Sequence, residues 1–244
     1  MSPITSSRTR LTTTAPLSPA GSAVEAARTR LVAGLVAATG VLLLIGESLL
    51  PKGADQHVTS RPMALAELAA AQGHRGQLLA AGLLIVFGLG GLAVTFAALS
   101  GLVRERAAGL ATLAAALGTL AAFCGAVINV LSSLIVVAAT TTGLPERDAA
   151  GFLVAAQHDS HIALAFGPTY LVGLPLASLL MSVALWRSKA VPRWTAVLFA
   201  VGMLAALSAP TGPVGGAVCL PLALALCSLA GRLLTRPSRH PATT

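Results

Sequence analysis

The sequence predicts an all-α protein, a polytopic transmembrane bundle of six helices with a disordered N-terminal tail. Of its 244 residues, 55% are hydrophobic and only 10% are charged, and the mean hydropathy is +0.83. A soluble domain carries about 25% charged residues, so this chain cannot cover a water-facing surface and needs lipid as its solvent. Its apolar residues are gathered into runs of about 20 residues, the length that crosses a hydrocarbon core as a helix.

The N-terminal segment differs in composition from the rest of the chain. Residues 1–27 are rich in Ser, Thr, Pro and Arg and cannot bury enough apolar area to fold, so they predict a disordered tail. A transmembrane domain over 28–236 and a short C-terminal tail over 237–244 follow. The expected spans are 31–50, 77–103, 107–139, 162–186, 194–209 and 214–234. The first span is too long for the apolar core of a signal peptide, so we expect it to be retained.

The distribution of Lys and Arg predicts the orientation. Twelve of the sixteen lie in the two tails, the 2–3 turn and the 4–5 turn, and four lie in the connections on the opposite side. Because basic residues are enriched in cytoplasmic loops, both termini are predicted in the cytoplasm of a cell (inner) membrane protein. Six of the eight acids fall on the opposite, outer side, and four of the five histidines do as well.

Two connections on the predicted outer side, 51–76 and 140–161, are long enough to contain structure of their own. In the first of these, the apolar residues Met63, Leu65, Leu68 and Ala69–Ala71 indicate a short helix. We expect this helix to be amphipathic and to lie on the outer leaflet.

The second outer connection contains a proline followed by acids. Pro145, Glu146 and Asp148 suit the first turn of a helix, where proline is tolerated and negative charge meets the positive end of the helix dipole. Such a helix would carry His158 and His161 to the start of the fourth span.

The third span contains a repeat of small residues that favours close helix packing. The repeat has four-residue spacing and comprises Ala114, Gly118, Ala122 and Ala126. Small residues at this spacing let two helix backbones approach each other in lipid. Asn129 and Ser133 continue the same face. An amide in hydrocarbon is costly unless it is bonded, so we expect both polar side chains inside the bundle, as interhelical bonding groups or as the lining of a polar cavity.

A divalent-metal site is the most specific chemical hypothesis that the sequence supports. His158 and His161 share one helical face, and His74 precedes the second span on the same side of the membrane. Glu47 lies inside the first span, about one turn from its outer end, where an acid needs a proton or a partner. Three histidines with Glu47 or Asp159 would suit Zn²⁺, and a catalytic site would leave one position for water.

Three classes of function remain open from the sequence. If the histidines only solvate loop ends, the chain is a structural or interaction protein. If they bind metal, a metal-dependent membrane hydrolase is possible, so enzymatic activity is undecided. A proton-coupled or small-molecule transporter would use Glu47 as the carrier, with His74 or His158 as the relay. His57 has no helical phase and His240 lies in the tail, so neither is included. Haem is disfavoured because no span carries a histidine near the inner side.

Other classes are excluded by motif and composition. The net charge is +8, but the basic residues are scattered between apolar runs, which argues against nucleic-acid binding. No glycine precedes a Lys-Ser or Lys-Thr pair, so a nucleotide-binding loop is not indicated. Cys124, Cys219 and Cys227 lie in apolar runs without a CxxC and are expected to be small buried hydrophobic residues.

Short segments of the chain resemble a known group of proteins. The first span ends in LLPKGAD, the following loop closes with AAAQGHRGQLLAAG, and His74–Gly76 form an H-R-G entry to the second span. With the short acidic loop before the fourth span, this pattern resembles uncharacterised actinobacterial six-span membrane proteins of the DUF4386-like kind, loosely over residues 31–210. The resemblance implies a six-span architecture and no particular activity.

Overall fold

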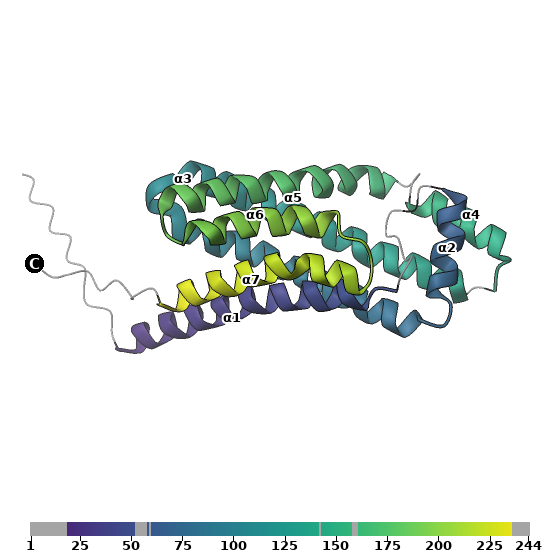
Figure 1. Cartoon of the computed structure of the whole chain (residues 1–244), viewed down its shortest axis with the longest axis horizontal. Coiled ribbons are helices and arrows are strands. Elements are labelled where there is room, and N and C mark those ends of the chain that lie inside the picture. The colour runs from purple at the N-terminus through teal and green to yellow at the C-terminus, as the bar shows by residue number, and fades with distance from the viewer. Residues whose placement is uncertain (1–18, 52–57, 59, 142, 158–160, 236–244) are drawn as a thin grey trace, which may run out of the picture.

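The structure is a computed structural model in which every regular element is a helix (Figure 1). It describes residues 19–51, 58, 60–141, 143–157 and 161–235, and the side chains within these ranges except 19–22, 104–106 and 161–163. No strand occurs in these ranges. The helices are α1 (Pro19–Leu49), α2 (Arg61–Ala71), α3 (Arg75–Thr141), α4 (Glu146–Gln157), α5 (His161–Ser188), α6 (Arg193–Leu207) and α7 (Pro213–Thr235). The predicted all-helical fold class is therefore confirmed over the described part of the chain.

Helix α3 contains two of the predicted spans. Its backbone leaves helical geometry at Ala107, where φ is −147° and ψ is 45°. This break separates Arg75–Val103 from Ala107–Thr141. The chain reverses direction there, as two contacts between the halves show: Gly118 packs on Phe96, and Gly82 packs on Ser133. The two halves are therefore antiparallel neighbours.

Five helices of the described chain are long and apolar enough to cross a membrane. They are Ala23–Leu49, Arg75–Val103, Ala107–Thr141, Leu164–Ser188 and Pro213–Thr235. The predicted fifth span corresponds to α6, which has only 15 residues and is about 22 Å long at 1.5 Å per residue. This is shorter than a hydrocarbon core of about 30 Å, so length and composition mark five spans and leave the sixth as a shorter apolar helix.

The first helix begins earlier than the sequence indicates. Helix α1 starts at Pro19, so residues 19–27, which we expected to be disordered, continue the first span as a helix. Proline is favoured in the first turn of a helix, and the Ala-rich segment that follows has high helix propensity. The rest of the predicted tail, residues 1–18, and the C-terminal tail from residue 236 lie outside the described residues.

The long helices close into a ring. Helix α3 packs against α1 and α5, α1 packs against α7, and α6 lies between α5 and α7. The start of α1 and the end of α7 lie at one end of the bundle, and α2 and α4 lie across the other end (Figure 1). Hereafter these are the terminal end and the α2–α4 end.

The interior of the ring is held together by aromatic packing and by close backbone approaches. Phe96 of α3 and Phe199 of α6 are fully buried and meet edge to face, with ring centroids 5.9 Å apart. Glycines allow neighbouring helices to approach them: a Cβ at Gly40 would lie 2.9 Å from Cα of Ala223. Such small-residue contacts are the means by which helices associate in lipid, where no hydrophobic force drives them together.

The outside of the bundle is apolar. Phe87, Val172 and Leu224 are 66%, 66% and 59% exposed, each on a different helix. In water such a surface would cause aggregation, whereas lipid chains solvate it. The structure therefore supports association with a lipid bilayer through the same residues that make the chain too apolar for water.

The short helix α2 is confirmed, but only part of its predicted apolar set is buried. Ala64, Glu67, Leu68 and Ala71 are buried, whereas Leu65, which we placed on the apolar face, is 39% exposed. The reason is that α2 packs on α4 and α3 and so has a protein surface to cover. Glu67, for which the apolar residues of this segment gave no prediction, is only 3% exposed.

Helix α4 begins as the sequence predicts. It starts at Glu146 after Pro145, with Glu146 and Asp148 in its first turn, and Ala149, Ala150 and Leu153 form its buried face. The side chain of Gln157, at its end, accepts a hydrogen bond of 3.2 Å from the backbone N–H of Val58. Helices α2 and α4 thus form a small cap over one end of the bundle.

Candidate functional site

The only acid inside the predicted spans lies close to the α2–α4 end. Glu47 is two residues before the end of α1 and is half-buried. The one Lys or Arg within the six predicted spans is Arg232, in the last turn of α7 at the terminal end. Among the described residues the Glu47 carboxylate makes no hydrogen bond and no ion pair. An acid at such a position needs a proton or an external partner.

The oxygen of a buried side-chain amide on α3 also lacks a hydrogen-bond partner among the described residues. Asn129 is 4% exposed, as its expected place inside the bundle requires. Its Nδ2 donates a 2.9 Å hydrogen bond to the carbonyl of Gly125, one turn earlier on the same helix. Its Oδ1 is buried and accepts no hydrogen bond within the described part of the chain. A buried acceptor without a donor is rare in folded proteins, and each instance calls for an explanation.

Two further groups join Glu47 and Asn129. The ring of Tyr170, on α5, packs directly on Gly125, and its phenol lies beside the Asn129 amide. Tyr170 and the Cys219 thiol of α7 both lie within electrostatic range of the Glu47 carboxylate. We call Glu47, Asn129, Tyr170 and Cys219 the polar cluster; α1, α3, α5 and α7 each contribute one member.

The four members lie at the same depth in the bundle. The helices that carry them are tied together at this level by close approaches between Gly46 and Ile85, Gly82 and Ser133, Gly125 and Tyr170, and Gly216 and Ser48. Below this level, towards the terminal end, the interior is closed by Phe96 and Phe199. Phe96 is eleven residues beyond Ile85 on the same helix, which is about 16 Å along the axis. The polar cluster therefore lies between the α2–α4 end and an aromatic layer.

A pocket opens at the helix ends on the α2–α4 side of the bundle. Its volume is about 340 Å³, and its lining residues come from the end of α1, from α2, from the start of α3 and from the start of α7: Ser48, Leu50, Pro51, Ala70, His74, Gln77 and Pro213. The Gln77 side chain donates a 2.7 Å hydrogen bond to the carbonyl of Leu49 and ties α3 to the end of α1. Ser48, the residue after Glu47 on α1, lines this pocket, and no member of the polar cluster is among its lining residues.

The structure describes only some of the predicted metal ligands. His74 is exposed at the start of α3 and lines the pocket described above, and Glu47 belongs to the polar cluster. His57, His158, Asp159 and His240 lie outside the described residues. His161 begins α5, and its side chain is not described.

No three His, Cys, Asp or Glu side chains within the described ranges are placed to hold a metal ion. The ligand set of His74, His158, His161 and Glu47 cannot be assembled from those ranges, because His158 and the His161 side chain fall outside them. The Zn²⁺ site, and with it the membrane hydrolase, stays a prediction.

The other interior residues are placed largely as expected. Ser133 lies in the α3 hairpin, where its Oγ would be 2.5 Å from a Cβ at Gly82. Cys124 and Cys219 are buried, but Cys227 is exposed on α7, so the expectation that all three cysteines are buried is wrong for Cys227. An apolar run contains both bundle-facing and lipid-facing positions, and hydropathy alone does not distinguish them.

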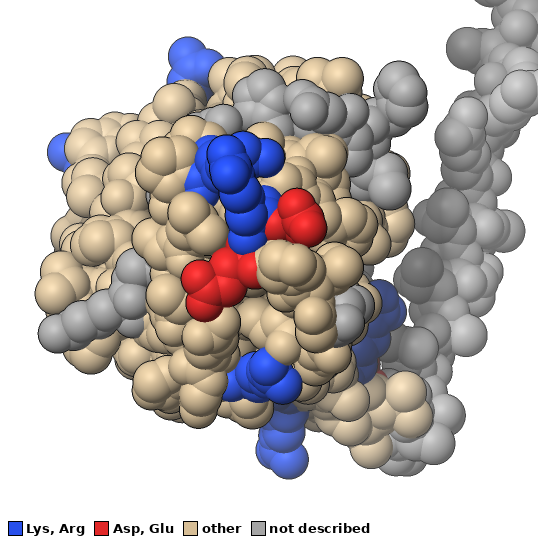
Figure 2. Space-filling model, turned by 90° about the vertical axis from the view of Figure 1, so that its right-hand side faces the viewer, with Lys and Arg blue, Asp and Glu red and all other residues tan. Residues whose placement is uncertain are grey.

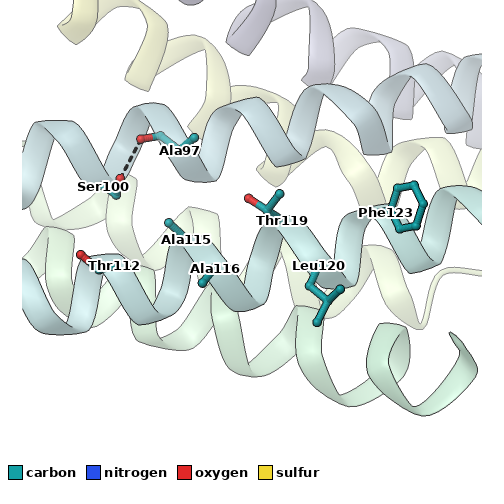
Figure 3. A pocket seen from close by; sticks show the side chains of 8 residues that line it. All are labelled: Ala97, Ser100, Thr112, Ala115, Ala116, Thr119, Leu120 and Phe123. Atoms are coloured by element: carbon teal, nitrogen blue, oxygen red, sulfur yellow. Dashed lines mark hydrogen bonds between the residues drawn. The ribbon is translucent and has the colours of Figure 1, made fainter. Parts of the chain in front are cut away.

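A second hollow lies on the outside of the α3 hairpin and carries no charge. Its volume is about 590 Å³, and Figure 3 shows its lining of Ala97, Ser100, Thr112, Ala115, Ala116, Thr119, Leu120 and Phe123. The Ser100 hydroxyl donates to the carbonyl of Ala97 and the Thr119 hydroxyl to that of Ala93. With these hydroxyls bonded to backbone, the groove offers mainly apolar contacts, which suit lipid chains.

Charged side chains of both signs gather at the α2–α4 end. Figure 2 shows basic and acidic groups close together on an otherwise uncharged face. Arg61, Glu146, Arg147 and Asp148 are exposed there. The Arg61 guanidinium reaches from α2 to within 3.5 Å of a Cβ at Gly151 on α4. The described part of this face is thus mixed in charge.

Sequence reasoning missed two members of the polar cluster. Tyr170 is the only tyrosine in the chain and lies inside an apolar span, a signal that could have singled it out. Cys219 carried no such signal, because a cysteine in an apolar run is most often a packing residue.

No protein-family model, curated protein or solved structure matches this chain. The resemblance to DUF4386-like proteins therefore stays a prediction.

Proposed function

We propose that this chain is a multi-pass protein of the cell membrane that binds a small polar solute from the outer face, with the polar cluster as its site. Both termini are cytoplasmic in this proposal, as the distribution of basic residues predicts. The α2–α4 end then faces outward, and the pocket at His74 is the entrance.

The observation that carries the proposal is the unpartnered Oδ1 of Asn129, buried beside Tyr170. A polar atom in this condition costs free energy on folding. Four helices bring polar side chains to one level of an otherwise apolar bundle, and two of these side chains, Glu47 and Asn129, have unused acceptors. A bound solute that donates hydrogen bonds would remove the cost.

Binding from one side is the form of activity that the packing favours. Phe96 and Phe199 are fully buried and in contact between the polar cluster and the terminal end. A solute at Glu47 would meet this aromatic layer before it reached the cytoplasm. Transport, the alternative within this proposal, would require the two rings to separate.

Cysteine accessibility tests whether water-borne solutes reach the polar cluster from outside. Cys219 and Cys124 are 1% and 3% exposed, but only Cys219 belongs to the cluster. Two variants are compared in intact cells: Cys124→Ala/Cys227→Ala, which retains Cys219, and Cys219→Ala/Cys227→Ala, which retains Cys124. Each is treated from outside with the impermeant reagent 2-(trimethylammonium)ethyl methanethiosulfonate, and the modified fraction is followed by mass spectrometry.

Cys219 is expected to react at least about tenfold faster than Cys124, because modification requires contact with the water-borne reagent and only Cys219 belongs to the cluster that solutes enter in this proposal. Equal rates, or reaction of Cys219 only after the reagent reaches the cytoplasm, would reject an outward-facing site. Reporter fusions at both ends check the orientation separately, and an extracellular C-terminus would place the pocket in the cytoplasm.

A further inference from the structure

We infer that the solute is a small organic ammonium ion, bound between the Glu47 carboxylate, the Asn129 amide oxygen and Tyr170. This inference rests on the proposed function and specifies the chemistry of its ligand. It follows from which hydrogen-bonding capacities the site leaves unused.

The polar cluster leaves two acceptors unused, on Glu47 and Asn129, beside the Tyr170 hydroxyl and the Cys219 thiol, each of which can donate one hydrogen bond. The Glu47 carboxylate accepts hydrogen bonds and, among the described residues, receives none. The Asn129 amide has one hydrogen bond as a donor, through Nδ2 to Gly125, and its free atom is the acceptor Oδ1. A ligand that satisfies both atoms must present donors.

The charge of the polar cluster also favours a ligand that is a cation. Glu47 is the only acid in the predicted spans, and the one base within them, Arg232, lies in the last turn of α7 at the opposite, terminal end of the bundle. A charge buried away from water is tolerated when it is paired and hydrogen-bonded. A cation with N–H donors meets both requirements of Glu47 at once, whereas an anion would be repelled and a neutral solute would leave the charge unpaired.

Tyr170 adds a third contribution. Its phenol lies beside the Asn129 amide, and it is within electrostatic range of Glu47. An aromatic ring attracts a cation through its quadrupole, most strongly where water is excluded. An acid, an amide oxygen and an aromatic ring together suit an organic ammonium ion better than a metal ion, which prefers several oxygen ligands.

The test compares two thiol reagents of similar size and opposite charge on the variant that retains Cys219. These are 2-(trimethylammonium)ethyl and 2-sulfonatoethyl methanethiosulfonate, and each rate is divided by the rate of the same reagent with a free thiol in solution. We expect the cationic reagent to be faster at Cys219 by at least about tenfold, because the carboxylate attracts one reagent and repels the other. Glu47→Gln should lower this ratio to about one, while Glu146→Gln, which removes an exposed acid on α4, should leave it within about twofold.

Protection experiments then test the need for donors. Methylammonium carries N–H donors and tetramethylammonium carries none, so methylammonium should protect Cys219 better, and acetate should not protect it. Asn129→Leu should abolish the advantage of methylammonium while the cation preference remains. Size-exclusion profiles in detergent establish that each variant is folded.

The possible failures are distinguishable. If neither reagent reaches Cys219 from outside, the proposed outward-facing site is wrong. If both reach it and the charge ratio is the same in wild type and Glu47→Gln, the site exists but does not select cations. If acetate protects as well as methylammonium, the ammonium ligand is likewise excluded.

Discussion

Replacing Gly202 by alanine tests the packing that holds the bundle closed. Gly202 lies on α6 where that helix meets α7, and a Cβ there would stand 2.5 Å from the backbone N and 2.7 Å from the Cα of Leu222. Carbon atoms pack at about 3.5–4.0 Å, and neither clashing atom belongs to a flexible side chain. The two helices must therefore move apart by about 1 Å.

The size of the effect follows from two opposing contributions. Overpacking of this kind costs about 1–3 kcal/mol, and a backbone clash belongs at the upper end because Phe199 and Met203, both buried on α6, lose contacts when the helix shifts. Alanine regains up to about 1 kcal/mol of helix propensity over glycine. The net destabilisation is about 1–2 kcal/mol, which lowers Tm by about 3–6 °C in a protein of this size.

The measurement is the fraction of monodisperse protein that survives heating in detergent, followed by size-exclusion chromatography. Gly90→Ala is the matched control, since Gly90 is exposed on α3 and a Cβ there meets nothing within 4 Å. Its Tm should be unchanged or slightly higher. If Gly202→Ala is as stable as Gly90→Ala, the close approach of α6 to α7 is not present in solution.

Three further predictions concern the helix ends, the cysteines and the interior amide. Gln77→Ala removes the hydrogen bond to the Leu49 carbonyl and should cost about 0.5–1.5 kcal/mol in the same heating assay; an unchanged Tm would mean that the tie is not formed. In detergent, N-ethylmaleimide should modify Cys227 of the native protein rapidly and Cys124 only after denaturation, because Cys227 is exposed and Cys124 is buried; rapid labelling of Cys124 would contradict the packing. Asn129→Leu should raise Tm, since it removes an unsatisfied buried oxygen whose burial costs about 1–3 kcal/mol, and a large fall would show that Asn129 has a partner in the folded state.

The helices were predictable because each depends on local sequence. Apolar runs bounded by Pro51, Arg104 and Arg106 determined where spans could begin and end, and Pro145 with Glu146 marked the start of α4. Helix α2 was found and Leu68 of its predicted apolar set is buried, but Leu65 is exposed and Glu67 is buried. Both helices that pack on it, α3 and α4, follow α2 in the chain. Which residues of α2 they cover cannot be predicted from the spacing within α2 alone.

The sequence by itself determined that the chain is helical and lipid-solvated, and that one acid, Glu47, lies within an apolar span. It also identified Asn129 as an interior residue, since an amide in lipid must face protein. Only the tertiary structure decided that Asn129, Tyr170 and Cys219 meet Glu47 at one depth. The physical reason is that membrane helices are apolar on every side, so their hydropathy does not indicate which side of each helix faces the interior of the bundle. The small-residue contacts between helices determine how each helix is rotated about its axis, and therefore which polar groups face one another.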